Sequence, residues 1–525
     1  MTQTDSEKTY DIVVIGGGIN GCGIARDAAG RGLSVLLCEK DDLAQATSSA
    51  STKLFHGGLR YLEYFEFALV RKALEEREVL LTAMPHISWP MRFVLPIDPA
   101  LRHTNETSTF GKVLSYIPFL KGKRPAWLTR CGLFLYDNLG GRKILPATKT
   151  LSLPGSPVGA PLQDRFRKAF EYSDCWVNDA RLVVLNARDA AQRGAEILTR
   201  TTCMSAERID GTWRVSLQKN GDAAPVIVKA RALVNAGGPW VDDILKTQLR
   251  QNAKASIRLV RGSHIVVRKM FDHDQPYFFQ LADGRIIFAI PYEEDFTLIG
   301  TTDVDHVGDP STAECTPEEQ DYLLKAANGF FKNTLTADDV VWTYSGVRPL
   351  FDDHSGDASA TTRDYVLSVL DADGTLPLLS VFGGKITTFR KLAEEALKDL
   401  TPYFPELKGK WTKAAPLPGG DFPVDGVPAL ITQLRTQYAF LDAAWAKRMI
   451  RLYGTDAVAV LGQAKTIGDL GQHFGASLYQ AEVDWLVTQE WARSAEDILW
   501  RRTKLGLRTT PEEVETLQVY LAQKE

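Results

Sequence analysis

Two apolar runs near the start of the chain, separated by a helical pattern, predict a strand–helix–strand unit. The first run, Tyr10–Ile15, leads directly into a glycine-rich turn and then into a stretch with helical character. The second run, Leu33–Cys38, follows that helix and ends at Glu39. A glycine-rich turn between a strand and a helix is typical of nucleotide-binding βαβ units.

The glycines of this turn, Gly16-x-Gly18-x-x-Gly21, have the spacing of a dinucleotide-binding loop. Gly16 allows the tight turn, Gly18 lets backbone approach a pyrophosphate, and Gly21 lets the helix pack closely on the strand. The helix N-terminus offers free N–H groups to phosphates. Glu39 stands about 20 residues beyond the glycines, where an acid can accept hydrogen bonds from ribose hydroxyls. We therefore expect FAD or NAD rather than a cofactor with a 2′-phosphate.

The later patterns predict a second sheet and a helical end. Between residues 257 and 302, β-branched runs separated by turn residues predict an antiparallel sheet. Strands running into double glycines recur at 233–240 and at 378–393, and the second is followed by a helix start whose partial positive charge would lie near a cofactor. Beyond a Pro/Gly-rich link at 415–423 the pattern is helical, and Thr510-Pro-Glu-Glu513 has the form of a capping box.

Composition narrows the class of protein. A chain of 525 residues predicts more than one domain, and a net charge of −4 offers no general attraction to nucleic acid. The six cysteines include no CxxC pair, so we expect neither a metal site nor a disulfide framework, and a reducing cytoplasmic setting. We expect no signal peptide, and no apolar run is long enough to span a membrane.

A segment after Glu39 carries a more specific signal. It is rich in small hydroxyl residues and then contains Gly57, Gly58, Arg60 and Tyr61. Together with the glycine turn, the runs Ser48-Ser-Ala-Ser-Thr-Lys53 and His56-Gly-Gly-Leu-Arg-Tyr-Leu-Glu63 resemble the FAD-dependent glycerol-3-phosphate dehydrogenase family. The resemblance runs from Asp11 to about Gly420 and continues less distinctly through residues 493–502.

This resemblance implies an α/β fold: an FAD-binding Rossmann-like domain of the glutathione-reductase type, an inserted antiparallel-sheet substrate domain and a C-terminal all-α domain. We expect the FAD-binding domain in three parts, an inserted segment, the substrate domain and a helical cap domain. The FAD-binding domain would comprise residues 1–84, 166–240 and 342–400. The inserted segment would be 85–165, the substrate domain 241–341 and the helical cap domain 401–525.

The cofactor is then expected to be non-covalent FAD. The residues expected to bind it come from the glycine turn, the hydroxyl-rich segment and the two double-glycine strand ends: Gly16, Gly18, Ile19, Asn20, Gly21, Glu39, Thr47, Ser48, Ser49, Lys53, Gly57, Gly58, Ala236, Gly237, Gly383, Gly384, Lys385, Ile386 and Thr387.

Oxidation of a secondary alcohol by flavin needs a base beside the carbinol carbon. His264 is our candidate because its ordinary pKa lies near neutrality and because Gly-Ser-His matches the family, although a strand histidine can also be purely structural. A phosphate dianion needs several cations. Arg60, Arg348, Arg363 and Lys385 lie in segments that resemble the family's active-site motifs, and Tyr61 could add a phenolic donor. We assign catalysis to His264, Arg348, Arg60 and Lys385, and substrate binding to these four with Tyr61 and Arg363.

One amphipathic stretch has no role in the resemblance. Residues 108–124 place Phe110, Val113, Leu114 and Ile117 on one apolar face flanked by lysines and Arg124. The face fits a helix lying in a lipid interface, and it fits equally a helix that covers the protein's own core.

The family implies oxidation of sn-glycerol 3-phosphate to dihydroxyacetone phosphate, with electrons passed to membrane quinone by a dimeric enzyme, peripheral on the inner face of the cell membrane. The chain departs from it in the longer segment 104–122 and in Ile386 and Phe389, where Leu and Tyr are commoner. Three alternatives stay open: an oxidase that reduces oxygen, an amine or amino-acid oxidase of the same fold, and a non-catalytic membrane adaptor.

Overall fold

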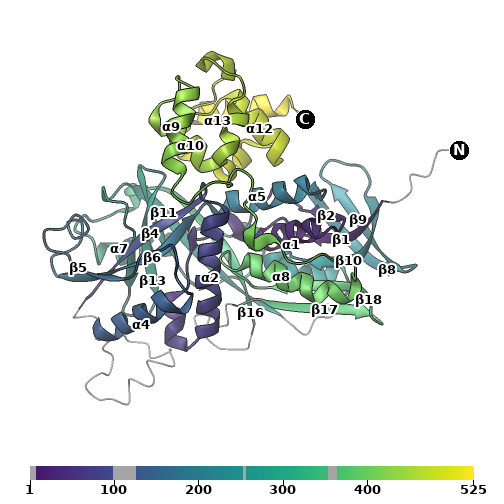
Figure 1. The fold of residues 1–525 in the computed structure, drawn as a ribbon, viewed down its shortest axis with the longest axis horizontal. Helices are drawn as coiled ribbons and strands as arrows, with labels where there is room; N and C mark the ends of the chain where they lie inside the picture. The colour runs from purple at the N-terminus through teal and green to yellow at the C-terminus, as the bar shows by residue number, and fades with distance from the viewer. Residues whose placement is uncertain (1–7, 99–125, 252–255, 353–363, 525) are drawn as a thin grey trace.

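Two β-sheets lie side by side, and a group of helices near the carboxyl-terminal end packs across them (Figure 1). This computed structural model describes residues 8–98, 126–251, 256–352 and 364–524. The predicted amphipathic stretch 108–124 and Arg363 lie outside the described residues. Within the described part of the chain, no helix combines the length and the apolar character needed to cross a membrane.

The first sheet contains the predicted nucleotide-binding unit. Strands β1, β2, β7, β10 and β18 are parallel to their neighbours, in the order β18-β10-β1-β2-β7, and β17 extends the sheet beyond β18. An antiparallel meander of β8 and β9 continues from β10. The bounds are β1 Thr9–Ile15, β2 Val35–Cys38, β7 Glu196–Leu198, β8 Thr201–Ile209, β9 Thr212–Lys219, β10 Val226–Asn235, β17 Val366–Ala372 and β18 Thr375–Phe382.

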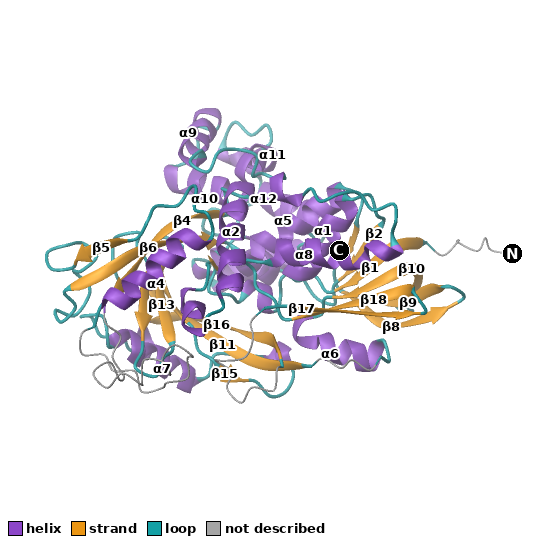
Figure 2. Ribbon diagram, turned by 60° about the horizontal axis from the view of Figure 1, so that its bottom comes forward, coloured by secondary structure: helices purple, strands orange, loops and turns teal. Residues whose placement is uncertain are grey.

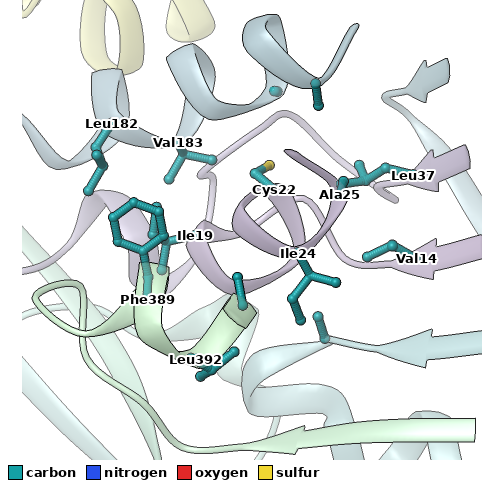
Figure 3. Close-up of a cluster of buried hydrophobic side chains, with 14 of the residues drawn as sticks. Val14, Ile19, Cys22, Ile24, Ala25, Leu37, Leu182, Val183, Phe389 and Leu392 are labelled. Carbon is teal, nitrogen blue, oxygen red and sulfur yellow. The ribbon is translucent and has the colours of Figure 1, made fainter. Parts of the chain in front are cut away.

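Three helices pack together on this sheet: α1 Ile19–Gly30, α5 Asp179–Gln192 and α8 Phe389–Leu400. Figure 3 shows their buried side chains meeting around α1, with Phe389 close to Ile19. A Cβ atom at Gly23 would lie 2.8 Å from the Phe389 ring, so the bare backbone of α1 makes room for α8. Phe389, one of the departures from the family pattern, is therefore a core residue.

The second sheet has ten strands in the order β15-β11-β14-β13-β12-β4-β6-β3, with β16 on β11 and β5 on β6. It is antiparallel except between β12 and β4. Helices α2, α4 and α7 belong to this half of the molecule (Figure 2). The bounds are β3 Leu54–Phe55, β4 Ser88–Pro96, β5 Lys149–Ser152, β6 Lys168–Val177, β11 Ile257–Arg268, β12 Tyr277–Gln280, β13 Ile286–Tyr292, β14 Phe296–Gly300, β15 Val304–Asp305, β16 Val340–Phe351, α2 Phe67–Ala83, α4 Ala126–Leu139 and α7 Pro317–Asn328.

The two sheets do not follow the domain boundaries that we expected. We expected β6 in the second part of the FAD-binding domain and β16 in the third, but both pair in the second sheet. Strand-forming residues give no local signal of the sheet in which they will pair, since the partners lie far along the chain. The strands before residue 100, β3 and β4, also belong to this sheet.

The carboxyl-terminal helices form a core of their own. They are α9 Val427–Gln437, α10 Ala443–Tyr453, α11 Ala457–Leu461, α12 Gln480–Glu490 and α13 Pro511–Ala522, with a π-helical segment at Asp497–Arg502. The capping box of α13 forms as predicted: the Glu513 amide donates to the Thr510 hydroxyl, and the Thr510 amide donates to the Glu513 carboxylate. Trp500 packs against this core, and its ring also stacks on Trp342 of β16, with ring centres 4.4 Å apart.

Candidate active site

A long groove lies at the carboxyl ends of β1, β2, β10 and β18. Its walls combine the glycine turn, the end of β2, the hydroxyl-rich segment and both double-glycine strand ends. Of the residues we expected to bind the cofactor, those that line it are Gly16, Gly18, Ile19, Asn20, Glu39, Thr47, Ser48, Ala236, Gly237, Gly383, Gly384, Lys385 and Ile386. The sheet thus gathers at one edge segments that are separated by more than three hundred residues.

The glycine turn is shaped as a cradle. Gly16 has φ +112°, and a Cβ atom there would lie 2.5 Å from the Ala236 carbonyl oxygen, so no other residue fits. Gly18 precedes α1 without a side-chain cap, and the Ile19 amide donates to the Ser48 hydroxyl at 3.0 Å. Gly18 and Ile19 line the groove, so the positive end of α1 faces it, as an anion-binding site for a pyrophosphate requires.

Glu39 is held in the groove wall at the end of β2. Its carboxylate accepts hydrogen bonds from the Gly17 amide at 2.6 Å and the Asp41 amide at 2.9 Å. Burial raises the pKa of this carboxyl, and the two amide donors act in the opposite direction. An ionised carboxylate has about four acceptor sites, so capacity remains for sugar hydroxyls.

Several expected cofactor residues lie behind the groove wall. Gly21 packs α1 against the turn, since a Cβ atom there would lie 1.9 Å from the Gly16 carbonyl oxygen. The Lys53 ammonium is buried against Asp179 at 2.8 Å. Gly57 donates its amide to the Tyr136 hydroxyl at 2.7 Å. Ser49 and Thr387 are also outside the groove lining, and Gly58 lines a second cavity instead.

The groove also contains residues that sequence reasoning missed. At one end the Lys40 ammonium lies 3.9 Å from the centre of a Trp240 ring, and Thr201, Thr202 and Cys203 of β8 line the same region. Lys40 directly follows Glu39, and Trp240 lies three residues after Gly237, so closeness to predicted residues was the available signal. Nothing local marked β8, because its place beside β2 depends on the folded sheet.

A second cavity contains part of the predicted cation cluster. Arg60 and Tyr61 reach it from the short helical segment Leu59–Tyr64, and Arg348 reaches it from β16. The Arg348 guanidinium pairs with the Asp303 carboxylate and donates to the Thr301 hydroxyl at 3.0 Å and the Thr302 carbonyl at 3.2 Å. Its orientation is therefore fixed by the chain that follows β14.

Lys385 lines the groove and contacts a residue of the cavity wall. Its ammonium lies 3.9 Å from the centre of the Tyr61 ring, and Lys385 itself lines the groove. Neighbouring residues Arg348 and Pro349 line the cavity and the groove respectively. Two of the four predicted cations, Arg60 and Arg348, thus line the cavity, and a third, Lys385, contacts its wall through Tyr61.

His264 is buried on β11, with a 1% exposed side chain. Its ring stacks on Tyr344 at 4.7 Å, and its Nε2 atom lies 2.9 Å from the Thr52 hydroxyl. Burial, the Arg348 guanidinium and the Lys53 ammonium together hold the pKa of His264 well below its ordinary value. The imidazole is therefore neutral at physiological pH and carries a lone pair.

Buried ion pairs fasten the carboxyl-terminal helices to the groove. The Asp42 carboxylate, two residues after Lys40, accepts from Arg501 Nε at 2.6 Å and from the two terminal nitrogens of Arg502 at 2.7 and 2.8 Å. Glu490 pairs with Arg181 of α5 in the same way. The groove loop after β2 thus depends on a partner from the end of the chain.

This fold and groove define a flavoprotein oxidoreductase of the Rossmann-like type. The family model for FAD-dependent oxidoreductases matches residues 11–390, and a model described as the C-terminal domain of alpha-glycerophosphate oxidase matches residues 410–522. The chain belongs to the FAD-dependent oxidoreductase family, and its cofactor is FAD.

Individual relatives are similar over nearly their whole length. A glycerol-3-phosphate dehydrogenase of Pseudomonas aeruginosa is 52% identical over 98% of this chain and 95% of its own. A D-erythritol 1-phosphate dehydrogenase of Brucella abortus is 51% identical over 96% of both chains. The crystal structure of the Bacillus halodurans glycerol-3-phosphate dehydrogenase with FAD is 27% identical, with a TM-score of 0.72 over 99% of this chain and 95% of that one.

Proposed function

We propose that the protein oxidises sn-glycerol 3-phosphate to dihydroxyacetone phosphate and passes the electrons to membrane quinone. The observation that carries this proposal is that Arg60 and Arg348 line one cavity, while Lys385 of the cofactor groove contacts Tyr61 in the wall of that cavity. Several fixed cations match a phosphate dianion better than the single carboxylate of an amino acid, which argues against an amino-acid oxidase. The dehydrogenase activities in the names of the relatives support the same substrate class.

FAD supplies the two-electron acceptor for the hydride that leaves the carbinol carbon. The chain's own residues bind, orient and deprotonate the substrate. We assign the phosphate to Arg60 and Arg348, because guanidinium groups form paired hydrogen bonds with phosphate oxygens. Lys385, held over Tyr61, faces the substrate from the groove side. His264 is neutral and buried, so its lone pair is available to receive the hydroxyl proton, although its lowered pKa makes it a weaker base than a free imidazole.

The experiment that tests this proposal is anaerobic titration of the purified holoenzyme. Glycerol 3-phosphate should bleach the flavin absorbance, and a quinone analogue should restore it. Absence of bleaching contradicts the proposed substrate. Rapid recovery in air, with peroxide formed in proportion to product and no stimulation by quinone, would assign the protein as an oxidase.

The relatives favour one second candidate substrate. D-Erythritol 1-phosphate has the same phosphate and secondary alcohol on a longer polyol, and the enzyme that carries this name is almost as similar to this chain. The titration should therefore be repeated with both compounds at equal concentration. The substrate with the larger kcat/KM is the one to assign.

We further propose that α4 contacts the membrane at which the quinone is reduced. Its buried side packs beside α2, while Trp127 is 61% exposed and Phe134 60% exposed on the outer side. Phe65 and Phe67, at the start of α2, are also exposed. Exposed Arg142 and Lys143 follow the helix, and cations beside an apolar face favour an anionic or zwitterionic lipid surface.

The membrane contact is tested by replacing Trp127 and Phe134 with serine together. The variant should shift from the membrane to the soluble fraction without a change in thermal unfolding. Val519→Ser on α13 is the matched control, because Val519 is 52% exposed on a different face. Unchanged partition of the double variant would contradict the assignment to the inner face of the cell membrane. The expected homodimer is tested separately, by light scattering.

A further inference from the structure

The proposed base does not itself line the cavity. Arg60 and Arg348 line it, and so does Thr52, but His264 is not among the described residues of its wall. The Thr52 hydroxyl oxygen lies 2.9 Å from His264 Nε2. Thr52 therefore stands between the space where a substrate hydroxyl would lie and the imidazole.

We propose that Thr52 is a proton relay, a catalytic residue that transfers the substrate's hydroxyl proton from the cavity to His264. The proposal rests on the proposed function, because it presumes a secondary alcohol held by Arg60 and Arg348. It assigns to the Ser-rich segment a chemical role beyond cofactor binding.

The relay requires one of the two neutral tautomers of His264. A neutral imidazole that acts as a base must carry its lone pair at the nitrogen that receives the proton. Nε2 is the ring nitrogen with a hydrogen-bond partner, while Nδ1 is buried and has none among the described residues. In the tautomer with the ring proton on Nδ1, the Thr52 hydroxyl donates to Nε2, and its oxygen remains able to accept from the cavity side.

The surrounding contacts hold the relay in one arrangement. The Asp179 carboxylate accepts hydrogen bonds from the amide and hydroxyl of Ser51, at 3.1 and 2.7 Å, and pairs with Lys53. The Tyr344 hydroxyl donates to the Ser51 carbonyl at 2.9 Å while its ring stacks on His264. Both neighbours of Thr52 are thus fixed to buried groups, one of which also positions the imidazole.

The step balances as a transfer of one proton. The substrate O–H bond breaks and a bond forms between its proton and the Thr52 oxygen, while the original Thr52 hydroxyl proton moves to Nε2. The electron pair of the broken O–H bond becomes the second bond of the carbonyl as the hydride leaves the carbinol carbon. The result is a neutral Thr52 and an imidazolium. Two protons are transferred in one concerted step.

The test compares Thr52→Val, which keeps the shape and removes the hydroxyl, with Thr52→Ser, which keeps the hydroxyl. Flavin reduction by glycerol 3-phosphate is followed anaerobically in a rapid-mixing instrument. We expect Thr52→Val to slow reduction about 10²-fold, at the low end of the usual effect of acid–base catalysis, and Thr52→Ser to stay close to wild type. Flavin content, thermal unfolding and the affinity for dihydroxyacetone phosphate should be unchanged in both variants.

A proton inventory distinguishes a relay from a residue that only positions His264. In mixtures of H2O and D2O the wild-type rate should fall along a curve, because two protons move, and the small residual rate of Thr52→Val should fall along a straight line. Thr52→Val combined with His264→Ala should be no slower than His264→Ala alone, because both act on one proton path.

Three results would overturn the relay: a wild-type inventory that is linear or flat, a Thr52→Val rate close to wild type, or a Thr52→Ser rate as low as that of Thr52→Val. Failure of the proposed function looks different, because glycerol 3-phosphate would then bleach neither the wild type nor any variant.

Discussion

The guanidinium of Arg348 and the carboxylate of Asp303 form an ion pair inside the cavity that we assign to the phosphate group. An unpaired Asp303 carboxylate would repel a phosphate. Because it is paired with Arg348, its charge is compensated, and it holds the guanidinium in place before the substrate binds. Removing Arg348 should therefore have a different consequence from removing Asp303.

Arg348→Ala should lower kcat/KM for glycerol 3-phosphate by about 10²-fold, as expected for the loss of charge-assisted hydrogen bonds. It also leaves the Asp303 carboxylate facing the phosphate. The double variant Arg348→Ala/Asp303→Asn should consequently recover about tenfold, because the repulsion is removed. Steady-state kinetics on the wild type, Arg348→Ala, Asp303→Asn and the double variant gives the coupling between the two residues. A double variant as poor as Arg348→Ala would show that the carboxylate does not face the substrate.

His264→Ala should retain FAD and slow anaerobic flavin reduction by roughly 10²–10⁴-fold, the usual effect of losing a general base. Substrate affinity should change little, since Arg60 and Arg348 stay in place. The measurement is single-turnover bleaching at saturating substrate. A rate equal to that of the wild type would leave His264 with a structural role on β11.

Asp42→Asn should weaken both the fold and the hold on FAD. Breaking a buried ion pair at one partner costs roughly 3–5 kcal/mol of unfolding free energy, because the remaining charges stay buried. Asp321→Asn is the matched control, since Asp321 pairs with Lys325 on the exposed surface of α7, where such a pair contributes about 0.3–0.5 kcal/mol. Thermal unfolding and the rate of FAD release measure the two effects. If the two variants behave alike, the carboxyl-terminal helices do not stabilise the groove.

His86 predicts a loss of stability in acid. It is fully buried, beside Gly420 and Gly454, and burial with nearby arginines lowers its pKa to about 3. The unfolded chain takes up this proton near pH 6.5, whereas the folded chain does not. The free energy of unfolding should therefore fall as pH decreases from about 6.5 toward 3, by up to a few kcal/mol from this residue.

The variant His86→Leu, of similar volume, removes the titrating group. Its unfolding free energy should depend less on pH than that of the wild type over the same range, as measured by urea denaturation at pH 7 and pH 5. Equal pH dependence in the two proteins would assign the acid sensitivity to other groups.

The sequence was most informative where a function needs a local pattern. The strand, the Gly16-x-Gly18 turn and the carboxylate of Glu39 are adjacent in the chain, so their spacing alone predicted the groove. The cations were found because their short motifs resemble a family, although nothing local showed that Arg60 and Arg348 share one cavity.

The sequence did not reveal contacts between residues that lie far apart along the chain. The pairing of β16 with β11 brings Arg348 to the cavity, and Asp303 fixes it there. Lys53 was expected to touch the cofactor, but the structure places it in a buried pair with Asp179, which is 126 residues away. A buried lysine and an exposed one look alike in a sequence until the partner is known.

The Asp42 pairs also bear on the order in which the protein matures. Arg501 and Arg502 are translated 459 and 460 residues after Asp42. The Rossmann-like strands can form early during synthesis, but the loop after β2 gains its buried partners only when those arginines emerge from the ribosome. Tight retention of flavin is therefore a late event in biogenesis, and nascent chains that stop short of residue 501 should release their flavin readily.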